Sequence, residues 1–265
     1  MAPPQRKDSS HKIRVGLFGF GRAGKAVAQE LIADGQIDLV WVAQRSTQER
    51  QYASDALGMS AQFNEGAMLA TGEQDADRLF AEQPVDFVVD FSGGNTLRYY
   101  GRAAARRGIG IISAVSHYGP RQLQFLRALG EQTRVLYSPN ITLGINFLLV
   151  AAQALKRMAP QADVEIIEQH FRGKPEVSGT ALRLAESLGL DTETQVNSIR
   201  VGGIVGKHEV IFGFPFQTLR LVHESISRNA FGQGALYALK RLSGEEECGY
   251  YTMEQLIREE FRGLA

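Results

Sequence analysis

The sequence predicts an α/β protein in which a doubly wound parallel sheet is joined to an inserted α+β domain with a mixed sheet. A glycine-rich turn at residues 19–24 lies between a β-rich segment and a helical one. Strand and helix patterns then alternate up to residue 137, whereas three strands follow one another without helices from residue 198. We expect residues 1–140 and 229–265 to form the first domain and residues 141–228 to form the second.

The composition is that of a globular protein without a general affinity for polyanions. Of 265 residues, 44% are hydrophobic, and 29 Lys and Arg balance 29 Asp and Glu. This balance argues against binding to nucleic acid or to an anionic membrane. Cys248 is the single cysteine, which excludes an intrachain disulfide and fits a reducing compartment. The first ten residues lack the apolar core of a signal peptide, and the apolar runs are too short to span a bilayer. We therefore expect a cytoplasmic protein.

The first turn predicts a dinucleotide site in a Rossmann-type fold. Residues 12–18 alternate as in a strand, residues 25–33 are helical, and the turn between them has the spacing G-x-G-x-x-G. Such glycines allow a tight turn, a close approach of the backbone to a pyrophosphate, and close packing of helix on strand. The residues assigned to the cofactor from this turn are Gly19, Phe20, Gly21, Arg22, Ala23 and Gly24.

The end of the second strand, residues 37–43, predicts which dinucleotide is preferred. NAD-binding chains usually place an acidic residue here, whereas this chain has Gln44, Arg45 and Ser46. No carboxylate repels a 2′-phosphate, and Arg45 can pair with one. We expect NADPH to be preferred, with NADH possible. The alternative is a polar loop with an incidental arginine.

The remaining first half continues the alternation of strands and helices. Residues 48–71 read as a loop; helices are expected at 75–82, 96–107 and 120–130, and strands at 85–91, 108–114 and 134–137. Ligands of such sheets bind beyond the carboxyl ends of the strands. The residues there that we assign to the cofactor are Phe91, Ser92, Ser113, Val115, Ser138 and Asn140.

The second half has a different pattern. A long helix is expected at 141–158, a strand at 164–167, a helix from residue 181, strands at 198–201, 208–214 and 219–225, and helices at 231–242 and 253–261. A polar turn after the first of these strands carries His170 and Lys174, and Ser178, Gly179 and Thr180 open the helix that follows. A helix start suits an anion, and an imidazole or ammonium can supply protons. The alternative is an ordinary helix cap behind a solvated basic turn.

Four further stretches, taken with the glycine turn, make the chain similar to a known family. They are residues 138–146 (SPNITLGIN), the block E-x-H…K…S-G-T-A at 168–181, residues 199–206 (IRVGGIVG) and residues 223–228. The sequence resembles the 4-hydroxy-tetrahydrodipicolinate reductase family, also called dihydrodipicolinate reductase. The resemblance implies NAD(P)H-dependent reduction of a cyclic imine dicarboxylate in the diaminopimelate and lysine pathway. It also implies a homo-oligomer, a tetramer or a dimer, and no metal.

The resemblance also implies roles for individual residues. His170 and Lys174 fall on the positions that deliver the proton, which the imine nitrogen needs once hydride has reached the neighbouring carbon. Ser178, Gly179 and Thr180 fall on the segment that holds a substrate carboxylate, and Phe171 and Arg228 also fall among substrate-binding positions.

The sequence departs from the family pattern in ways that leave the substrate open. Phe171 replaces a second histidine, and Ser113 begins an altered turn beside the cofactor. The stretch from Lys174 to Ser178 is one residue shorter than the family's K-x-D-A-P-S and lacks the proline that precedes the serine there. The reductase is the leading hypothesis. A related enzyme that reduces another imine is an alternative, and a non-catalytic NADP-binding protein is a third.

Overall fold

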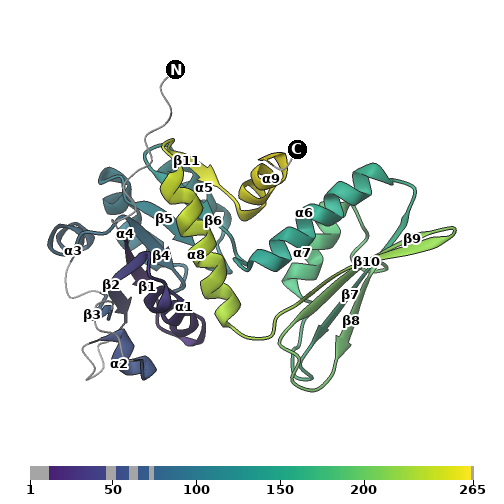
Figure 1. Ribbon diagram of the computed structural model, residues 1–265, viewed down its shortest axis with the longest axis horizontal. Coiled ribbons are helices and arrows are strands. Elements are labelled where there is room, and N and C mark those ends of the chain that lie inside the picture. The colour runs from purple at the N-terminus through teal and green to yellow at the C-terminus, as the bar shows by residue number, and fades with distance from the viewer. Residues whose placement is uncertain (1–11, 46–51, 60–64, 72–74, 264–265) are drawn as a thin grey trace. The chain divides into compact units, whose positions relative to one another are not determined.

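The computed structural model describes residues 12–45, 52–59, 65–71 and 75–263, which form two compact units. The first unit holds the described residues of Met1–Ile141 and Phe231–Thr252, and the second holds those of Thr142–Ala230 and Met253–Ala265. Figure 1 labels their helices and strands. The last helix, α9 (Met253–Gly263), therefore groups with the second unit, whereas we expected it in the first domain. It buries Met253, Leu256 and Ile257, and it contacts α6 of that unit.

The first unit is built on a seven-stranded parallel sheet of order β11-β6-β5-β4-β1-β2-β3. Its strands are β1 (Ile13–Phe18), β2 (Ile37–Gln44), β3 (Ala67–Ala70), β4 (Phe87–Asp90), β5 (Gly110–Ser113), β6 (Arg134–Tyr137) and β11 (Gly249–Tyr251). Strand order reverses between β1 and β4, which is the switch point of a doubly wound sheet. The predicted fold class is thus confirmed for this unit.

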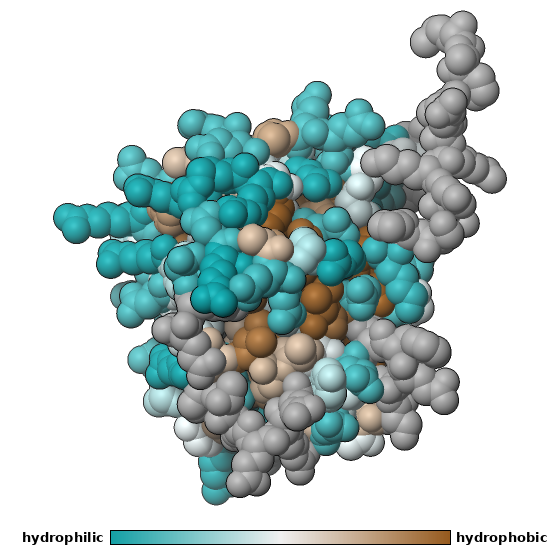
Figure 2. Space-filling model, turned by 90° about the vertical axis from the view of Figure 1, so that its left-hand side faces the viewer, coloured by the Kyte–Doolittle hydropathy of each residue, from teal (hydrophilic) through white to brown (hydrophobic). Residues whose placement is uncertain are grey.

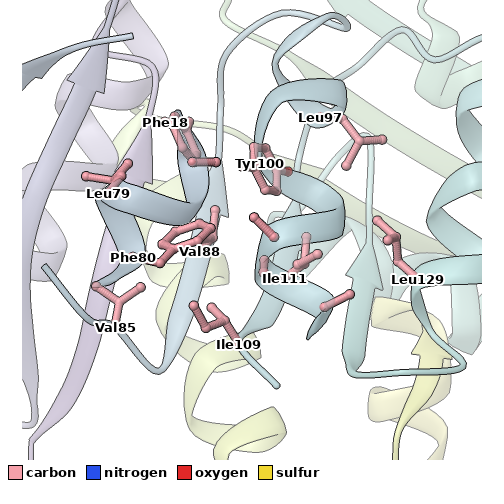
Figure 3. Close-up of a cluster of buried hydrophobic side chains, with 14 of the residues drawn as sticks. Phe18, Leu79, Phe80, Val85, Val88, Leu97, Tyr100, Ile109, Ile111 and Leu129 are labelled. Carbon is pink, nitrogen blue, oxygen red and sulfur yellow. The ribbon is translucent and has the colours of Figure 1, made fainter. Parts of the chain in front are cut away.

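The helices of the first unit cover the sheet. They are α1 (Arg22–Ala33), α2 (Ala53–Leu57), α3 (Ala76–Glu82), α4 (Thr96–Arg106), α5 (Pro120–Leu129) and α8 (Asn229–Gly244). Side chains of α3, α4 and α5 share one buried cluster with the strands, part of which Figure 3 shows. Phe18 of β1 belongs to this cluster, stacked on Tyr100 at 4.7 Å and edge-on to Trp41 at 5.1 Å between ring centroids. Burial of such side chains is the main source of stability for the sheet.

Two segments of the first unit form elements that the sequence pattern did not predict. Residues 48–71 were expected to be a loop, but α2 and β3 lie there, and β3 pairs in parallel with β2. Strand β11, which was not expected, pairs in parallel with β6. Both strands lie at edges of the sheet and are short, so they are defined by pairing with a neighbour and not by their own alternation.

The second unit packs two helices on a four-stranded mixed sheet of order β10-β9-β7-β8. The helices and strands of this layer pair are α6 (Leu143–Met158), β7 (Asp163–His170), α7 (Gly179–Leu188), β8 (Val196–Arg200), β9 (Lys207–Phe214) and β10 (Gln217–Glu224). Strands β7 and β8 are parallel, whereas β7 with β9 and β9 with β10 are antiparallel. The predicted mixed sheet is confirmed. Helix α6 begins two residues later than expected and ends before Pro160.

The two faces of this sheet differ in polarity and burial. On the face covered by α6 and α7, apolar residues such as Ile166, Val210 and Phe212 are buried. Paired residues of neighbouring strands share a face, so Ser198, Glu168, His208 and His223 form one polar row across the covered face. The residues between these along each strand point to the opposite face, and they include the exposed Val222 and Ile199.

None of the helices in the described part of the chain is both long and apolar enough to cross a membrane. Figure 2 shows one face of the molecule, on which hydrophilic side chains predominate and the largest apolar area lies in the middle of the view.

Candidate functional site

The turn between β1 and α1 has the geometry expected of its glycines. Gly19 has φ +98°, and a Cβ there would lie 2.7 Å from the backbone of Phe91. A Cβ on Gly24 would lie 2.1 Å from the carbonyl oxygen of Gly19, so helix and turn touch at this point. A Cβ on Gly21 would meet nothing within 4 Å. Gly19 and Gly24 therefore shape the turn, and Gly21 leaves open space beside the start of α1.

A cavity of about 400 Å³ lies against this turn, and we call it the Gly19 cavity. Its lining residues are Phe18, Gly19, Phe20, Gly21, Ala43, Gln44, Arg45, Thr71, Phe91, Ser92, Gly93 and Thr96. They come from the carboxyl ends of β1, β2 and β4 and the segments that follow them, and from Thr71 directly after β3. The structure thus brings Gln44, Arg45, Phe91 and Ser92 together with the glycine turn.

Other residues predicted for the cofactor lie outside the lining of this cavity. Arg22, Ala23 and Gly24 form the first turn of α1. Ser113, which ends β5, and Val115 after it are buried, as is Ser138 after β6, whereas Asn140 is half-buried. The carbonyl of Ser113 accepts the Ser138 N–H at 3.0 Å, and the Ser138 hydroxyl donates to the carbonyl of Asn140 at 2.8 Å. Ser46 lies outside the described residues.

Asp90, which the sequence reasoning did not select, supports the Ser92 side of the cavity. This buried carboxylate accepts the Ser92 N–H at 2.9 Å, the Ser92 hydroxyl at 2.5 Å and the Tyr100 hydroxyl at 2.9 Å. Burial raises the pKa of Asp90, and the hydrogen bonds from Ser92 and Tyr100 oppose that rise. The three bonds fix the backbone at the end of β4, where the chain turns along the cavity.

The second unit contains a polar cluster centred on Glu168, whose side chain is fully buried. Arg200 holds both carboxylate oxygens, with N–O distances of 2.9 and 2.5 Å. The Ser198 hydroxyl donates to the carboxylate at 2.6 Å, and the Ser178 N–H at 3.1 Å. Burial alone would raise the pKa of Glu168, but the bonds from Arg200, Ser198, His170 and Ser178 outweigh it and lower the pKa to about 2. We call Glu168, His170, Ser178, Ser198, Arg200 and His208 the Glu168 cluster.

His170 is oriented by this carboxylate. Its Nδ1 lies 2.5 Å from Glu168 Oε2, so Nδ1 carries a hydrogen and Nε2 faces away from the carboxylate, toward Gly206. We expected His170 in a polar turn, but β7 continues to it. The strand is longer because Glu168 and His170 alternate with Ile167 and Gln169 and both have partners on the covered face. That part of the prediction was wrong.

Lys174 lies in the turn between β7 and α7, which Arg200 holds in place. Its N–H donates to the carbonyl of Phe171 at 3.1 Å, and its own carbonyl accepts from Arg200 Nε at 3.1 Å. Arg200 also donates to the carbonyl of Glu176 at 2.8 Å. The Lys174 charge is among the causes that lower the pKa of His208. One arginine therefore connects the turn of Lys174 to the carboxylate that orients His170.

The predicted substrate-binding residues are only partly gathered here. Ser178 caps α7 and is buried, and Gly179 and Thr180 are the first two residues of that helix. Phe171 is 46% exposed beside the turn. Arg228, between β10 and α8, is exposed and forms no hydrogen bond or ion pair with another described residue. No group of three or more metal-ligating side chains gathers among the residues that the structure describes.

Arg200, Ser198 and His208 are members of the cluster that the sequence reasoning did not select as site residues. Their signal was weak, because each lies on a different strand from Glu168 or far from it in sequence. The alternation of Glu168 and His170 with apolar or amide residues was a usable signal that both face the covered side.

Comparison with known proteins agrees with this architecture. A family model described as dihydrodipicolinate reductase, N-terminus, matches residues 13–141, and one described as dihydrodipicolinate reductase, C-terminus, matches residues 144–257. A 4-hydroxy-tetrahydrodipicolinate reductase of Caldanaerobacter subterraneus subsp. tengcongensis is 31% identical over 198 residues, which cover 67% of this chain and 78% of that protein. One from Burkholderia thailandensis is 29% identical over 94% of this chain and 98% of its own length.

A solved structure shows the same fold. Dipicolinate-bound dihydrodipicolinate reductase from Paenisporosarcina sp. TG-14 superposes with a TM-score of 0.73 at 19% identity, covering 91% of this chain and 97% of that one. Because the two family models together span nearly the whole chain, the protein belongs to the dihydrodipicolinate reductase family, whose enzymes act in diaminopimelate and lysine biosynthesis, and it is an NAD(P)H-dependent oxidoreductase.

Proposed function

We propose that the protein reduces 4-hydroxy-tetrahydrodipicolinate, a cyclic imine that carries two carboxylates. The observation that carries this proposal is the Glu168 cluster, which holds His170, the turn of Lys174 and the start of α7 in one hydrogen-bonded network. A proton source and a place for an anion therefore lie in the same network, as reduction of an imine dicarboxylate requires.

When bound, the reduced nicotinamide supplies a hydride to the imine carbon. The electron pair of the C=N bond then moves onto nitrogen, which takes up one proton to become a secondary amine. Lys174 donates that proton from its ammonium group, and His170, held by Glu168, supports it. The first turn of α7, beginning at Gly179, and the Lys174 charge bind the two carboxylates. A Cβ at the Gly179 position would meet no described atom within 4 Å, so the start of α7 is open there.

The Gly19 cavity fits a dinucleotide, and we propose that it prefers NADPH. The buried Gln44 Nε2 has no partner among the described residues, so a hydrogen-bond donor faces the site unpaired. Gly21 leaves room for a pyrophosphate beside the amides of α1. Arg45 is exposed at the cavity, where its guanidinium can pair with a 2′-phosphate. Dissociation constants for NADPH and NADH, measured by fluorescence titration, test the preference.

A different imine is the second candidate substrate, because two apolar side chains are exposed beside the cluster. Phe171 is 46% exposed and Val177 is 40% exposed, and both belong to the turn that carries Lys174. An assay that follows NADPH absorbance with 4-hydroxy-tetrahydrodipicolinate and with a panel of less polar cyclic imines separates the two candidates. Restored growth of a diaminopimelate-requiring bacterial strain would support the first, and turnover of a panel imine alone would contradict it.

We also propose that the protein is a homo-oligomer formed through the open face of the four-stranded sheet. Ile199 and Val222 are 42% and 52% exposed on that face. The strand register places Ile167 and Ile211 on the same face. Apolar residues in the middle of a sheet are usually covered. Light scattering after size-exclusion chromatography measures the assembly, and Val222→Glu should dissociate it. A monomeric parent protein would contradict the proposal.

A further inference from the structure

His208 is the member of the Glu168 cluster for which the proposed mechanism has no use. It lies on β9 directly opposite Glu168 in the register of the sheet, and only 5% of it is exposed. Its Nε2 is 2.9 Å from the Ser178 hydroxyl, and its ring meets that of His170 edge-on at 5.4 Å. Its Nδ1 has no hydrogen-bond partner among the described residues. A buried histidine with one paired nitrogen requires an explanation.

The surroundings keep this imidazole neutral. Burial above all, together with His170 on β7, His223 on β10 and Lys174 in the turn, lowers the pKa of His208 to about 4. The carboxylate of Glu168 opposes them without cancelling the effect. At neutral pH the ring therefore carries one hydrogen, on either Nδ1 or Nε2.

The hydrogen-bond pattern decides between these two tautomers. With the hydrogen on Nδ1, a buried N–H would have no acceptor, and Ser178 would have to donate its hydroxyl hydrogen to Nε2. With the hydrogen on Nε2, His208 donates to the Ser178 oxygen, and only the lone pair of Nδ1 lacks a partner. Buried N–H groups without acceptors are the rarer and costlier case. The tautomer with the hydrogen on Nε2 is therefore favoured.

This direction leaves the Ser178 hydroxyl hydrogen available. The Ser178 N–H is already bonded to Glu168, and its side chain does not cap an amide of α7. A hydroxyl that donated to His208 would instead turn its oxygen lone pairs toward any anion at the start of α7. Those lone pairs would repel the anion. A hydroxyl that accepts from His208 can donate to that anion.

We propose that His208 is a positioning residue: by donating from Nε2 to the Ser178 oxygen, it directs the Ser178 hydroxyl hydrogen to a carboxylate of the substrate. The identity of that carboxylate rests on the proposed function, whereas the direction of the hydrogen bond does not. Glu168 and His208 then hold the two polar groups of Ser178 separately, the N–H by Glu168 and the oxygen by His208.

The direction of the bond can be measured without any ligand. Long-range proton–nitrogen NMR spectra of protein with labelled histidine distinguish protonated from bare ring nitrogens, and His208→Gln identifies the His208 signals by their loss. We expect a protonated Nε2 and a bare Nδ1 at pH 7. A protonated Nδ1 with a bare Nε2 would overturn the inference, whether or not the protein reduces the proposed imine.

Binding of dipicolinate, an unreactive dicarboxylate, to the protein saturated with NADPH tests the consequence by calorimetry. His208→Leu should weaken dipicolinate binding about 10-fold or more, because a charge-assisted hydrogen bond is lost. His208→Gln keeps a donor near the position of Nε2 and should stay within about 3-fold of the parent protein. In a Ser178→Ala background, His208→Leu should have no further effect, since its role passes through the hydroxyl.

Two controls separate this role from a structural one. His223→Leu removes the next histidine of the same row, one strand farther from Glu168, and should leave dipicolinate affinity within about 3-fold, because the Ser178 hydroxyl bonds His208. NADPH affinity and thermal unfolding show whether each variant is folded. Additive effects of Ser178→Ala and His208→Leu would overturn the inference. A parent protein that binds no dipicolinate would contradict the proposed function, and the NMR measurement would still decide the direction of the hydrogen bond.

Discussion

The Gly19 cavity and the Glu168 cluster are built in different ways. The cavity is shaped mainly by backbone, since Gly19 and Gly24 set the turn and strand ends supply the walls. The cluster is centred on one buried carboxylate: Glu168 accepts from side chains of β7 and β8 and from the Ser178 N–H, and His208 of β9 joins through the Ser178 hydroxyl. A backbone site depends on a few positions that tolerate no Cβ. A side-chain site depends on a network in which each member supplies hydrogen-bond partners to the other buried polar groups.

The largest effect should come from the proton donor of the side-chain site. Lys174→Ala should lower kcat by about 10²–10⁴, the usual loss when a general acid is removed. NADPH affinity should not change, because Lys174 does not line the Gly19 cavity. His170→Ala should lower kcat less. Steady-state kinetics with each variant check this; a raised KM with unchanged kcat would show that Lys174 only binds an anion.

Replacing Arg200 should test whether the Glu168 cluster is a single hydrogen-bonded network. Arg200→Met leaves the carboxylate of Glu168 buried without its main partner, and we expect a loss of about 3–5 kcal/mol in the free energy of unfolding. Arg228→Met, at an exposed arginine, is the matched control and should change that free energy by about 0.5 kcal/mol or less. Urea denaturation measures both. Equal effects of the two variants would show that Glu168 does not depend on Arg200.

The pH dependence of stability should reveal the same carboxylate. The pKa of Glu168 is about 2 in the folded protein against an ordinary value of 4.5, so the folded state binds fewer protons. Its contribution, about 3 kcal/mol, is present above pH 4.5 and is lost as the pH falls toward 2. Unfolding free energies measured at a series of acidic pH values should fall less steeply for Glu168→Gln than for the parent protein. Parallel curves would contradict the lowered pKa.

Two glycine variants should separate shape from binding in the backbone site. Gly24→Ala places a Cβ against the Gly19 carbonyl and should cost about 1–3 kcal/mol of stability. Gly21→Ala meets no protein atom, so it should leave stability unchanged and weaken NADPH binding, because the new methyl group occupies the space beside α1. Thermal unfolding and NADPH titration of both variants test this. The reverse pattern would show that Gly21 shapes the turn.

The smallest effect concerns cofactor choice. Arg45→Ala should weaken NADPH binding by about 1–2 kcal/mol, because Arg45 is exposed and its contact with a 2′-phosphate is partly screened. NADH binding should stay the same. Titrations with the two cofactors decide, and equal losses for both would show that Arg45 does not recognise the phosphate.

The same contrast explains what the sequence could predict. The glycine turn, the first two strands and α1 were predictable because the motif and its flanking elements are contiguous in the chain. The two short edge strands β3 and β11 were not, because a parallel neighbour and not their own alternation defines them.

The residues of the candidate site also fall into those that the sequence could predict and those that it could not. His170 and Lys174 could be selected from one stretch of sequence. The structure places His170, at the end of a strand, in the Glu168 cluster and bonds the backbone of Lys174 to Arg200. Arg200 could not be selected, since the strand register alone brings it to Glu168, 32 residues earlier in the chain. His208 likewise depends on the antiparallel pairing of β7 with β9. Pairing register is a tertiary property that one sequence does not display.

The polar row across the second sheet has a consequence for folding. Its members Ser198, Glu168, His208 and His223 come one from each of four strands, so the row is complete only when β8 and β10, the two outer strands, have both been added. The lining of the Gly19 cavity comes from residues 18–96 of the first unit alone. NADPH binding therefore does not depend on this row, whereas the proposed turnover needs both sites. We expect a refolding chain to regain the capacity to bind NADPH before it regains turnover.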